Sequence, residues 1–230
     1  MNGILYGVGV GPGDPGLMTC LAVETIEKCP VIAVPARGRE LAASYRIASG
    51  IVKGIEEKEC LNLSVPMTKE RQILEENYAA AAGQIIEQLK KGRDVAYLTL
   101  GDPTIYSTYI YIHRIVRKQG YEARIINGVP SFCAAAAKFG DSLADREQQI
   151  HIIPSSYEIE DALSCKGNKV LMKAGSRLPA VKRTLLEKGV SGIMIENCGM
   201  PGEKVYPNIE EMPDEAGYYT VILVKEGLHD

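Results

Sequence analysis

An unbroken apolar run from Val95 to Leu100, followed at once by Gly101-Asp102-Pro103, is the feature that most restricts how this chain can fold. A strand without polar alternation suits a position buried on both faces, as in the middle of a parallel sheet. The pattern after the triplet predicts a helix from Thr104 to Gln119, with Asp102 as its N-cap and Pro103 as its first residue. Because this turn joins a strand to a helix, we expect it at the carboxyl edge of the sheet, where open α/β proteins bind ligands.

The first half of the chain alternates short apolar runs with longer helical segments. Further strands are predicted at Ile4–Val10 and Val31–Val34, and further helices at about residues 16–28, 36–50 and 69–91. The longest of these helices repeats apolar side chains at three- and four-residue steps. The alternation predicts an α/β domain with a parallel sheet, which we place at residues 1–119.

The second half, residues 120–230, has the pattern of another α/β domain. Its predicted strands are Ala123–Ile126, Gln149–Ile153, Lys169–Lys173, Gly192–Glu196 and Tyr218–Val224, and Ser131 is placed to cap a helix over 132–139. The last two strands are expected to pair antiparallel, with a turn at 200–203 between them, which would make this sheet mixed. No low-complexity linker separates the halves, so we expect the two domains to be closely packed.

Composition argues against several classes of protein. The chain has 26 Lys and Arg against 29 Asp and Glu, a net charge of −3, which disfavours nucleic acid as an obligate partner. Its apolar runs are shorter than the roughly 18 residues of a membrane span. No basic segment followed by an apolar one opens the sequence, so a cytoplasmic location is expected. The six cysteines are far apart and the histidines number three, so neither a disulfide framework nor a protein-bound metal is expected.

The segment Gly11-Pro12-Gly13-Asp14-Pro15-Gly16 matches the dinucleotide fingerprint G-x-G-x-x-G and lies between a predicted strand and a predicted helix. That fingerprint works through backbone N–H groups that face a pyrophosphate. Here two prolines remove donors and Asp14 adds a negative charge. An NAD-dependent oxidoreductase and a non-catalytic nucleotide-binding module are alternatives. Against the oxidoreductase, the second strand runs from Val34 into Pro35-Ala36 with no acidic residue at its end.

Gly-Asp-Pro occurs twice, at Gly13–Pro15 and at Gly101–Pro103, each time between a predicted strand and a predicted helix. In one interpretation both are simply well-capped helix starts. In the other, the two turns form a ligand site that is rimmed by carbonyls and carboxylates and is unsuited to phosphate. A neutral or cationic molecule such as a sulfonium nucleoside would fit that site. The residues therefore predict an α/β enzyme that acts on a small molecule.

Three segments resemble the tetrapyrrole methylase family of S-adenosylmethionine-dependent methyltransferases: Gly9–Pro15, Leu98–Thr108 and the turn Gly128–Ser131. The resemblance extends over essentially the whole chain. Within the family, the stretch from Leu98 to Tyr109 is most similar to the precorrin-2 C-20 methyltransferases of cobalamin synthesis, and the segments Val34–Ala36 and Val65–Thr68 add to that similarity.

The resemblance implies two α/β domains with the active site in the cleft between them, and a homodimer. It implies S-adenosylmethionine as methyl donor and S-adenosylhomocysteine as product. Carried over by position, the cofactor contacts fall on Pro12, Leu100, Gly101, Asp102, Ile105, Ser107, Thr108, Pro130, Ser131, Lys173, Asn197, Cys198 and Thr220. The family commonly has Pro-Gly-Val-Ser-Ser where this chain has residues 127–131, so a contact at Pro130 would use its carbonyl or its ring.

The resemblance also implies a tetrapyrrole meso carbon as methyl acceptor, in metal-free precorrin-2 or in cobalt-factor II. A proton must leave that carbon after methylation, and Asp102 is the predicted catalytic proton acceptor. Because the substrate carries carboxylates, Arg37, Arg39 and Arg177 are predicted to bind it, with Tyr106 stacked on the macrocycle. Solvated surface charge and ordinary helix packing are the competing explanations. A sister methylase that acts on another tetrapyrrole position, on RNA or on protein is the alternative activity.

Overall fold

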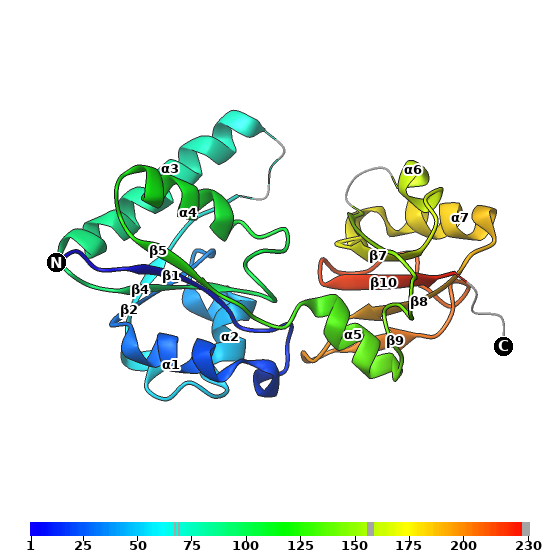
Figure 1. The fold of residues 1–230 in the computed structure, drawn as a ribbon, viewed down its shortest axis with the longest axis horizontal. Helices are drawn as coiled ribbons and strands as arrows, with labels where there is room; N and C mark the ends of the chain where they lie inside the picture. The colour runs from blue at the N-terminus through cyan, green and yellow to red at the C-terminus, as the bar shows by residue number, and fades with distance from the viewer. Residues whose placement is uncertain (67, 69, 156–158, 227–230) are drawn as a thin grey trace. The chain divides into compact units, whose positions relative to one another are not determined.

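The computed structural model describes residues 1–66, 68, 70–155 and 159–226. The chain divides into two compact units, Met1–Pro130 and Ser131–Asp230, whose helices and strands are labelled in Figure 1. The join predicted after Gln119 differs from this division. Strand β5 (Ala123–Ile126), which follows the predicted join, pairs with strand β1 (Leu5–Gly9) and so completes the sheet of the first unit.

Five strands among the described residues form a parallel sheet in the first unit, in the order β3-β2-β4-β1-β5. The other three are β2 (Val31–Val34), β3 (Glu59–Asn62) and β4 (Val95–Thr99). The parallel sheet is confirmed. Strand β3 was not predicted, because it lies at the edge of the sheet and its short sequence, Glu-Cys-Leu-Asn, contains no run of buried residues.

Helices cover both faces of this sheet, as Figure 1 shows. Helices α1 (Cys20–Lys28) and α2 (Ala43–Ser49) pack on one face, and α3 (Arg71–Lys90) and α4 (Tyr109–Lys118) pack on the other. Alternate residues of β4 face the two layers: Ala96 and Leu98 contact the α1–α2 side, and Tyr97 contacts the α3–α4 side. Burial on both faces explains why the sequence of β4 shows no alternation of polar and apolar residues from Val95 to Leu98.

Both helices that follow a Gly-Asp-Pro turn begin later than predicted. Asp14 caps only a short 3₁₀ turn, η1 (Pro15–Leu17), and α1 starts after Thr19, whose hydroxyl accepts from the Ala22 N–H at 3.1 Å. Helix α4 starts at Tyr109, so Asp102 is not its N-cap. The physical reason is Tyr106, whose φ of 46° is left-handed and breaks any right-handed helix between Thr104 and Tyr109.

The helix predicted at 36–50 is also interrupted. It consists of a 3₁₀ turn, η2 (Arg39–Leu41), and of α2, which are separated at Ala42 because that residue has an extended backbone. A further 3₁₀ turn, η3 (Ile55–Glu57), precedes β3. None of the helices within the described ranges is long and apolar enough to cross a membrane.

The second unit contains a mixed sheet, as predicted, in the order β6-β7-β10-β8-β9. Its strands are β6 (Ile150–Pro154), β7 (Asn168–Met172), β8 (Ser191–Glu196), β9 (Lys204–Tyr206) and β10 (Thr220–Lys225). Among the described strands of this sheet, only β6 and β7 pair in parallel. The predicted antiparallel pairing of β8 with β10 is confirmed, but the turn at 200–203 leads to β9, which pairs with the opposite edge of β8.

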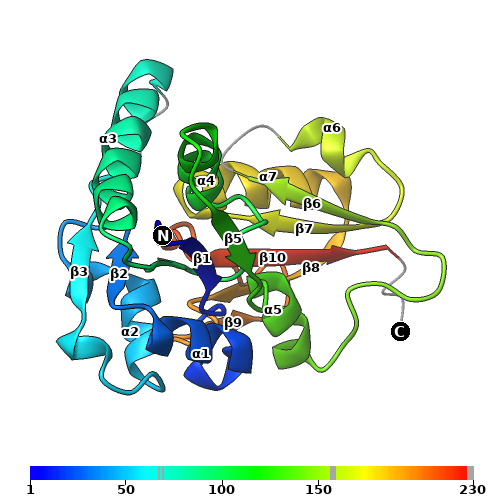
Figure 2. The same cartoon turned by 60° about the vertical axis from the view of Figure 1, so that its left-hand side comes forward.

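Helices α6 (Glu160–Leu163) and α7 (Leu178–Lys188) pack on one face of the second sheet through Leu171 and Ile222. The 3₁₀ turn η4 (Gly175–Arg177) leads into α7. Helix α5 (Ser131–Phe139) contacts β10, and it lies on the other face of this sheet in both Figure 1 and Figure 2.

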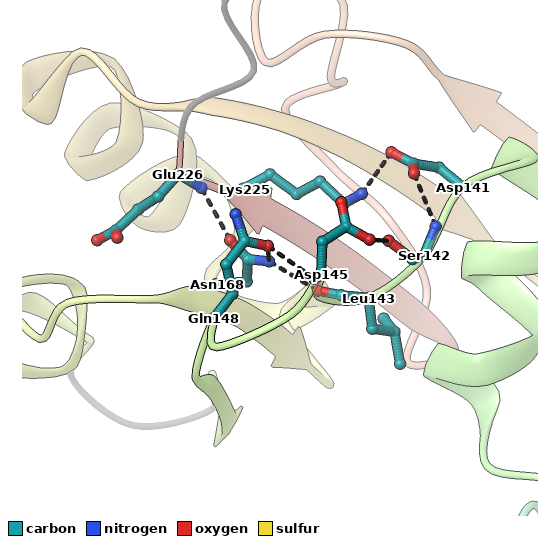
Figure 3. Close-up of polar contacts among 8 residues, drawn as sticks. All are labelled: Asp141, Ser142, Leu143, Asp145, Gln148, Asn168, Lys225 and Glu226. Atoms are coloured by element: carbon teal, nitrogen blue, oxygen red, sulfur yellow. Dashed lines mark hydrogen bonds and ion pairs between the residues drawn. The ribbon is translucent and has the colours of Figure 1, made fainter.

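The connection from α5 to β6 is held by one buried side chain, Asn168 (Figure 3). Its amide Nδ2 donates to the carbonyl of Leu143 at 2.8 Å and to Oε1 of Gln148 at 3.2 Å, and its Oδ1 accepts from the Glu226 N–H at 2.9 Å. Lys225 forms an ion pair with Asp141 at the start of the same connection. These contacts tie the connection to the amino end of β7 and the carboxyl end of β10.

Candidate functional site

The carboxyl ends of three adjacent strands, β4, β1 and β5, lie at the same edge of the first sheet, and each continues into a turn that contains glycine. The turns after β1 and β4 are joined directly by an antiparallel bridge between Gly11 and Gly101. The Gly101 N–H donates to the Gly11 carbonyl at 2.7 Å, and the Gly11 N–H donates to the Gly101 carbonyl at 3.3 Å. The two Gly-Asp-Pro motifs therefore belong to one structure at the carboxyl edge of the sheet.

The three turns approach too closely for side chains at two positions. A Cβ added to Gly9 would lie 2.6 Å from the Gly101 carbonyl oxygen and 2.6 Å from the Gly128 nitrogen. A Cβ added to Gly128 would lie 2.2 Å from the same carbonyl oxygen. These neighbours are backbone atoms that cannot rotate away, so any substitution would push the turns apart.

The carboxylate of Asp102, at the end of β4, connects two of these turns. Oδ1 accepts from the Thr104 N–H at 2.7 Å and from the Thr104 hydroxyl at 2.5 Å, within its own turn. Oδ2 accepts from Nδ2 of Asn127 at 3.0 Å and from the Gly128 N–H at 3.0 Å, in the turn after β5. Asp102 is 6% exposed, so this carboxylate is an internal part of the turn structure.

These contacts also determine the charge of Asp102. Burial raises the pKa of its carboxyl, but the hydrogen bonds from Thr104, Asn127 and Gly128 outweigh burial and hold the pKa below its usual range. An ionised carboxylate has about four lone-pair sites, and four donors among the described residues occupy them. A low pKa and filled acceptor sites suit a structural anion and do not favour the proton-accepting role predicted from the sequence.

Four backbone donors at this edge have partners inside the protein. The Gly16 N–H donates to Oδ1 of Asp14 at 2.8 Å, the Gly128 N–H donates to Asp102, and Gly11 and Gly101 bond to each other. A pyrophosphate would need such N–H groups to point outward. The edge consequently fits a neutral or positively charged ligand better than a dinucleotide.

The structure places the predicted cofactor residues of the first unit around these turns. Pro12 is buried beside the Gly11–Gly101 bridge, and Leu100, Ile105, Ser107 and Thr108 lie partly buried between β4 and α4. The Ile105 N–H donates to the Asp102 carbonyl at 3.2 Å, so the position of Ile105 depends on the same turn. Pro130 follows the turn after β5.

In the second unit, three predicted residues lie together because β10 runs antiparallel between β7 and β8. Lys173 follows the end of β7 and its N–H donates to the carbonyl of Thr220 at 3.1 Å, while the Asn197 N–H donates to the Tyr219 carbonyl at 2.9 Å. Lys173 and Asn197 have left-handed φ values of 61° and 54°. Non-glycine residues in this conformation carry strain, which is common at ligand sites.

Of the two other cofactor predictions in this unit, Cys198 follows Asn197 and is buried. Burial raises the pKa of its thiol to about 11, and Glu203 contributes in the same direction, so the group is neutral and unreactive near neutral pH. Ser131 is the first residue of α5. No group of three or more His, Cys, Asp or Glu side chains in the described part of the chain is arranged to hold a metal ion.

The predicted substrate residues have different surroundings. Arg37 is exposed just after β2, and Arg177 ends η4. Arg39 donates from Nη1 to the Glu56 carbonyl at 2.8 Å, pairs with Glu40 at 3.2 Å and lies over a tyrosine ring, so it stabilises the packing of η2 on η3. Tyr106 is 46% exposed in the segment between β4 and α4.

Sequence reasoning missed two polar residues of this edge, Thr104 and Asn127, which donate to Asp102. An Asn-Gly pair after a strand and a threonine two residues after an aspartate are turn signals, but neither identifies a partner far away in the sequence. The neighbouring tyrosines on α4 have structural roles. Tyr111 stacks on Tyr78 of α3 with ring centroids 4.9 Å apart, and Tyr109 is buried against β1.

Comparison with known proteins identifies the family of this chain. The sequence model of the Tetrapyrrole (Corrin/Porphyrin) Methylases matches residues 4–213. The chain is 33% identical over 171 residues to a probable cobalt-precorrin-2 C(20)-methyltransferase of Methanocaldococcus jannaschii, covering 74% of this chain and 71% of the relative. It is 30% identical over 236 residues to the cobalt-precorrin-2 C(20)-methyltransferase of Salmonella typhimurium, covering 98% of each chain.

Solved structures show the same fold. A cobalt precorrin-4 methyltransferase superimposes with a TM-score of 0.75 at 19% identity, covering 96% of this chain and 94% of that one. A uroporphyrin-III C-methyltransferase of Thermus thermophilus, complexed with S-adenosylhomocysteine, superimposes with a TM-score of 0.70 at 18% identity, covering 97% and 98%. With a family match over most of its length and the same two-unit α/β fold, this chain belongs to the tetrapyrrole (corrin/porphyrin) methylase family.

Proposed function

We propose that this protein transfers the methyl group of S-adenosylmethionine to C-20 of precorrin-2 or cobalt-factor II in cobalamin biosynthesis. The observation that carries the proposal is the similarity over 98% of both chains to a C-20 methyltransferase. The carboxyl edge of the first sheet supports it, because four of its backbone N–H groups are bonded internally while Asp14 adds a negative charge. Such an edge favours a sulfonium cation over a phosphate.

S-adenosylmethionine, when bound, supplies a methyl group on a positively charged sulfur. The task of the protein is alignment, since in-line displacement requires the nucleophilic carbon and the methyl group in near-attack geometry. In this proposal the contacts to the methyl donor are those that the family resemblance implies: Pro12, Leu100, Gly101, Asp102, Ile105, Ser107, Thr108, Pro130, Ser131, Lys173, Asn197, Cys198 and Thr220.

The substrate is a macrocycle with several carboxylate side chains, which cationic residues would recognise. Arg37 is the leading candidate because it is exposed just after β2, whereas Arg39 is engaged by Glu56 and Glu40. Arg177 and the exposed ring of Tyr106 complete the proposed substrate contacts. Reversing the charge with Arg37→Glu should raise the KM for the tetrapyrrole. An unchanged KM would remove Arg37 from the substrate site.

Two measurements test the activity. Isothermal titration should detect micromolar binding of S-adenosylhomocysteine and no binding of NAD, and the reverse result would favour the oxidoreductase alternative. Mass spectrometry and NMR of the product formed from precorrin-2, and separately from its cobalt form, would then report the methylated carbon and the preferred substrate. A methyl group at another position would identify a sister methylase.

The homodimer implied by the resemblance and the cytoplasmic location are part of this proposal. Sedimentation equilibrium over a range of protein concentrations would test the first, and fractionation of cells that produce the protein would test the second. A monomer at all concentrations, or recovery with membranes, would contradict the corresponding expectation.

A further inference from the structure

The surroundings of Asp102 point to a positioning role. We infer that Asp102, Thr104, Asn127 and Gly128 form a carboxylate clamp that positions the cofactor-binding turn, with Asn127 as a positioning residue for cofactor binding. This inference rests on the proposed function, because the turn from Leu100 to Ile105 is a cofactor contact only if the protein binds S-adenosylmethionine.

The clamp joins two strands that do not pair with each other. Strand β1 lies between β4 and β5 in the sheet, so the backbone ladder alone does not connect the turn after β4 to the turn after β5. Asp102 makes the connection by reaching Asn127 and Gly128 at 3.0 Å each. Gly9 at the end of β1 leaves room for this, since a Cβ there would collide with Gly101 and Gly128.

The same carboxylate determines the path of the cofactor-binding turn. Oδ1 holds the N–H and the hydroxyl of Thr104, and the N–H of Ile105 bonds to the Asp102 carbonyl at 3.2 Å. If Oδ2 lost its partners, Asp102 would keep its bonds to Thr104 but would no longer hold the turn after β4 to the turn after β5. The clamp therefore couples the turn after β5 to the residues predicted to contact the methyl donor.

The charge of the clamp comes from one group. Its donors, which come from Thr104, Asn127 and Gly128, are all uncharged. Hydrogen bonds to an ionised acceptor are stronger than neutral ones. Removing one donor therefore weakens the clamp. A second negative charge beside Asp102 would weaken it further, because the two carboxylates would repel each other.

The first test compares variants that remove single donors. Asn127→Ala deletes the amide but keeps the Gly128 N–H, and should weaken S-adenosylhomocysteine binding by roughly three- to tenfold in isothermal titration. Thr104→Ala should weaken binding similarly, whereas Thr104→Ser keeps the hydroxyl and should restore it. In methylation assays the loss should appear in the KM for S-adenosylmethionine, with kcat retained at saturation. Loss of a proton acceptor would instead lower kcat and leave the KM for S-adenosylmethionine little changed.

The second test uses pH. Asn127→Asp places two carboxylates together, so its affinity for S-adenosylhomocysteine should be weakest near pH 8 and should rise several-fold towards pH 5.5, as the pair comes to share a proton. The wild-type protein should show a flat profile over the same range. The matched control is Asn77→Asp on α3, which makes the same charge change at an amide bonded to Ile73 and should keep the flat profile.

The outcomes separate the two proposals. If the wild-type protein does not bind S-adenosylhomocysteine, the proposed function is wrong, and the clamp inference, which rests on it, falls with it. If the wild type binds, but Asn127→Ala and Thr104→Ala bind equally well and Asn127→Asp shows no pH dependence, the clamp inference is overturned. Thermal unfolding of each variant checks that the fold is intact, and the Thr104→Ser and Thr104→Ala pair provides a mild comparison should a change at 127 prevent folding.

Discussion

The ring of Tyr109 in α4 occupies the space that a side chain at Gly7 in β1 would need: a Cβ on Gly7 would lie 2.1 Å from the tyrosine ring. The Tyr109 hydroxyl donates to the carbonyl of Arg124 at 2.8 Å and lies 3.0 Å from Nδ1 of His113. The single hydroxyl proton of Tyr109 is donated to the Arg124 carbonyl. In a neutral His113, Nδ1 must therefore carry the proton of the bond between His113 and the Tyr109 oxygen. Gly7, Tyr109 and His113 therefore fix α4 on the sheet.

Gly7→Ala should destabilise the protein by roughly 1–3 kcal/mol, because the buried tyrosine ring has no space in which to move. The measurement is the free energy of unfolding in urea. Gly83→Ala is the matched control, since Gly83 lies within α3 with nothing within 4 Å of its added Cβ. That change should stabilise the helix by about 0.5–1 kcal/mol. Equal effects of the two substitutions would contradict the close packing at Gly7.

His113 should make stability depend on pH. Burial lowers the pKa of its imidazole, and Arg117 and Arg114 lower it further. The unfolded chain therefore binds a proton at a higher pH than the folded protein does. The stability contributed by neutral His113 is complete above the ordinary histidine pKa and is lost as the pH falls below it towards the folded value. Thermal unfolding between pH 8 and pH 5 should show this loss, and His113→Gln should reduce the slope.

Asp102→Asn should destabilise the protein near neutral pH by about 1–3 kcal/mol, because the new NH₂ group faces donors on one side of the clamp. The native pKa of Asp102 is lowered, so its stabilising effect exists above the ordinary aspartate pKa and is lost as the pH falls through the folded value. The difference between the variant and wild type should then shrink below about pH 4. A constant difference down to pH 2 would show that the charge of Asp102 is not what stabilises the turns.

Asn168→Ala should destabilise the protein by about 2–3 kcal/mol, since it leaves the Leu143 carbonyl and the Glu226 N–H without their partner (Figure 3). Limited proteolysis should show faster cleavage within residues 141–148 in addition to the loss of stability. Ser142→Ala is the control, because it removes an exposed contact to Asp145 in the same connection and should change stability by less than about 0.5 kcal/mol. Cleavage at the same rate in both variants would contradict the role of Asn168.

Much of the fold could be predicted from the sequence because its strands carry local signals. The apolar run of β4 and the Gly-Asp-Pro turn after it predicted a buried parallel strand that ends at a ligand edge, and the pairing of β8 with β10 was also predicted. Three features were not predicted. The start of α1 depends on the extended backbone of Met18, the start of α4 depends on the left-handed backbone of Tyr106, and strand β3 depends on its pairing at the edge of the sheet. These features carry no distinctive residue pattern.

The sequence by itself determined the α/β class, the mixed second sheet, the family and the two Gly-Asp-Pro turns, because hydrophobic period and turn residues act over a few neighbouring positions. Tertiary structure decided what the aspartates of these turns do. Asp14 caps a short turn, while Asp102 reaches across β1 to Asn127 and Gly128. The same tripeptide has two roles because the partners of a carboxylate, and hence its pKa, come from strands distant in sequence that the folded sheet brings to one edge.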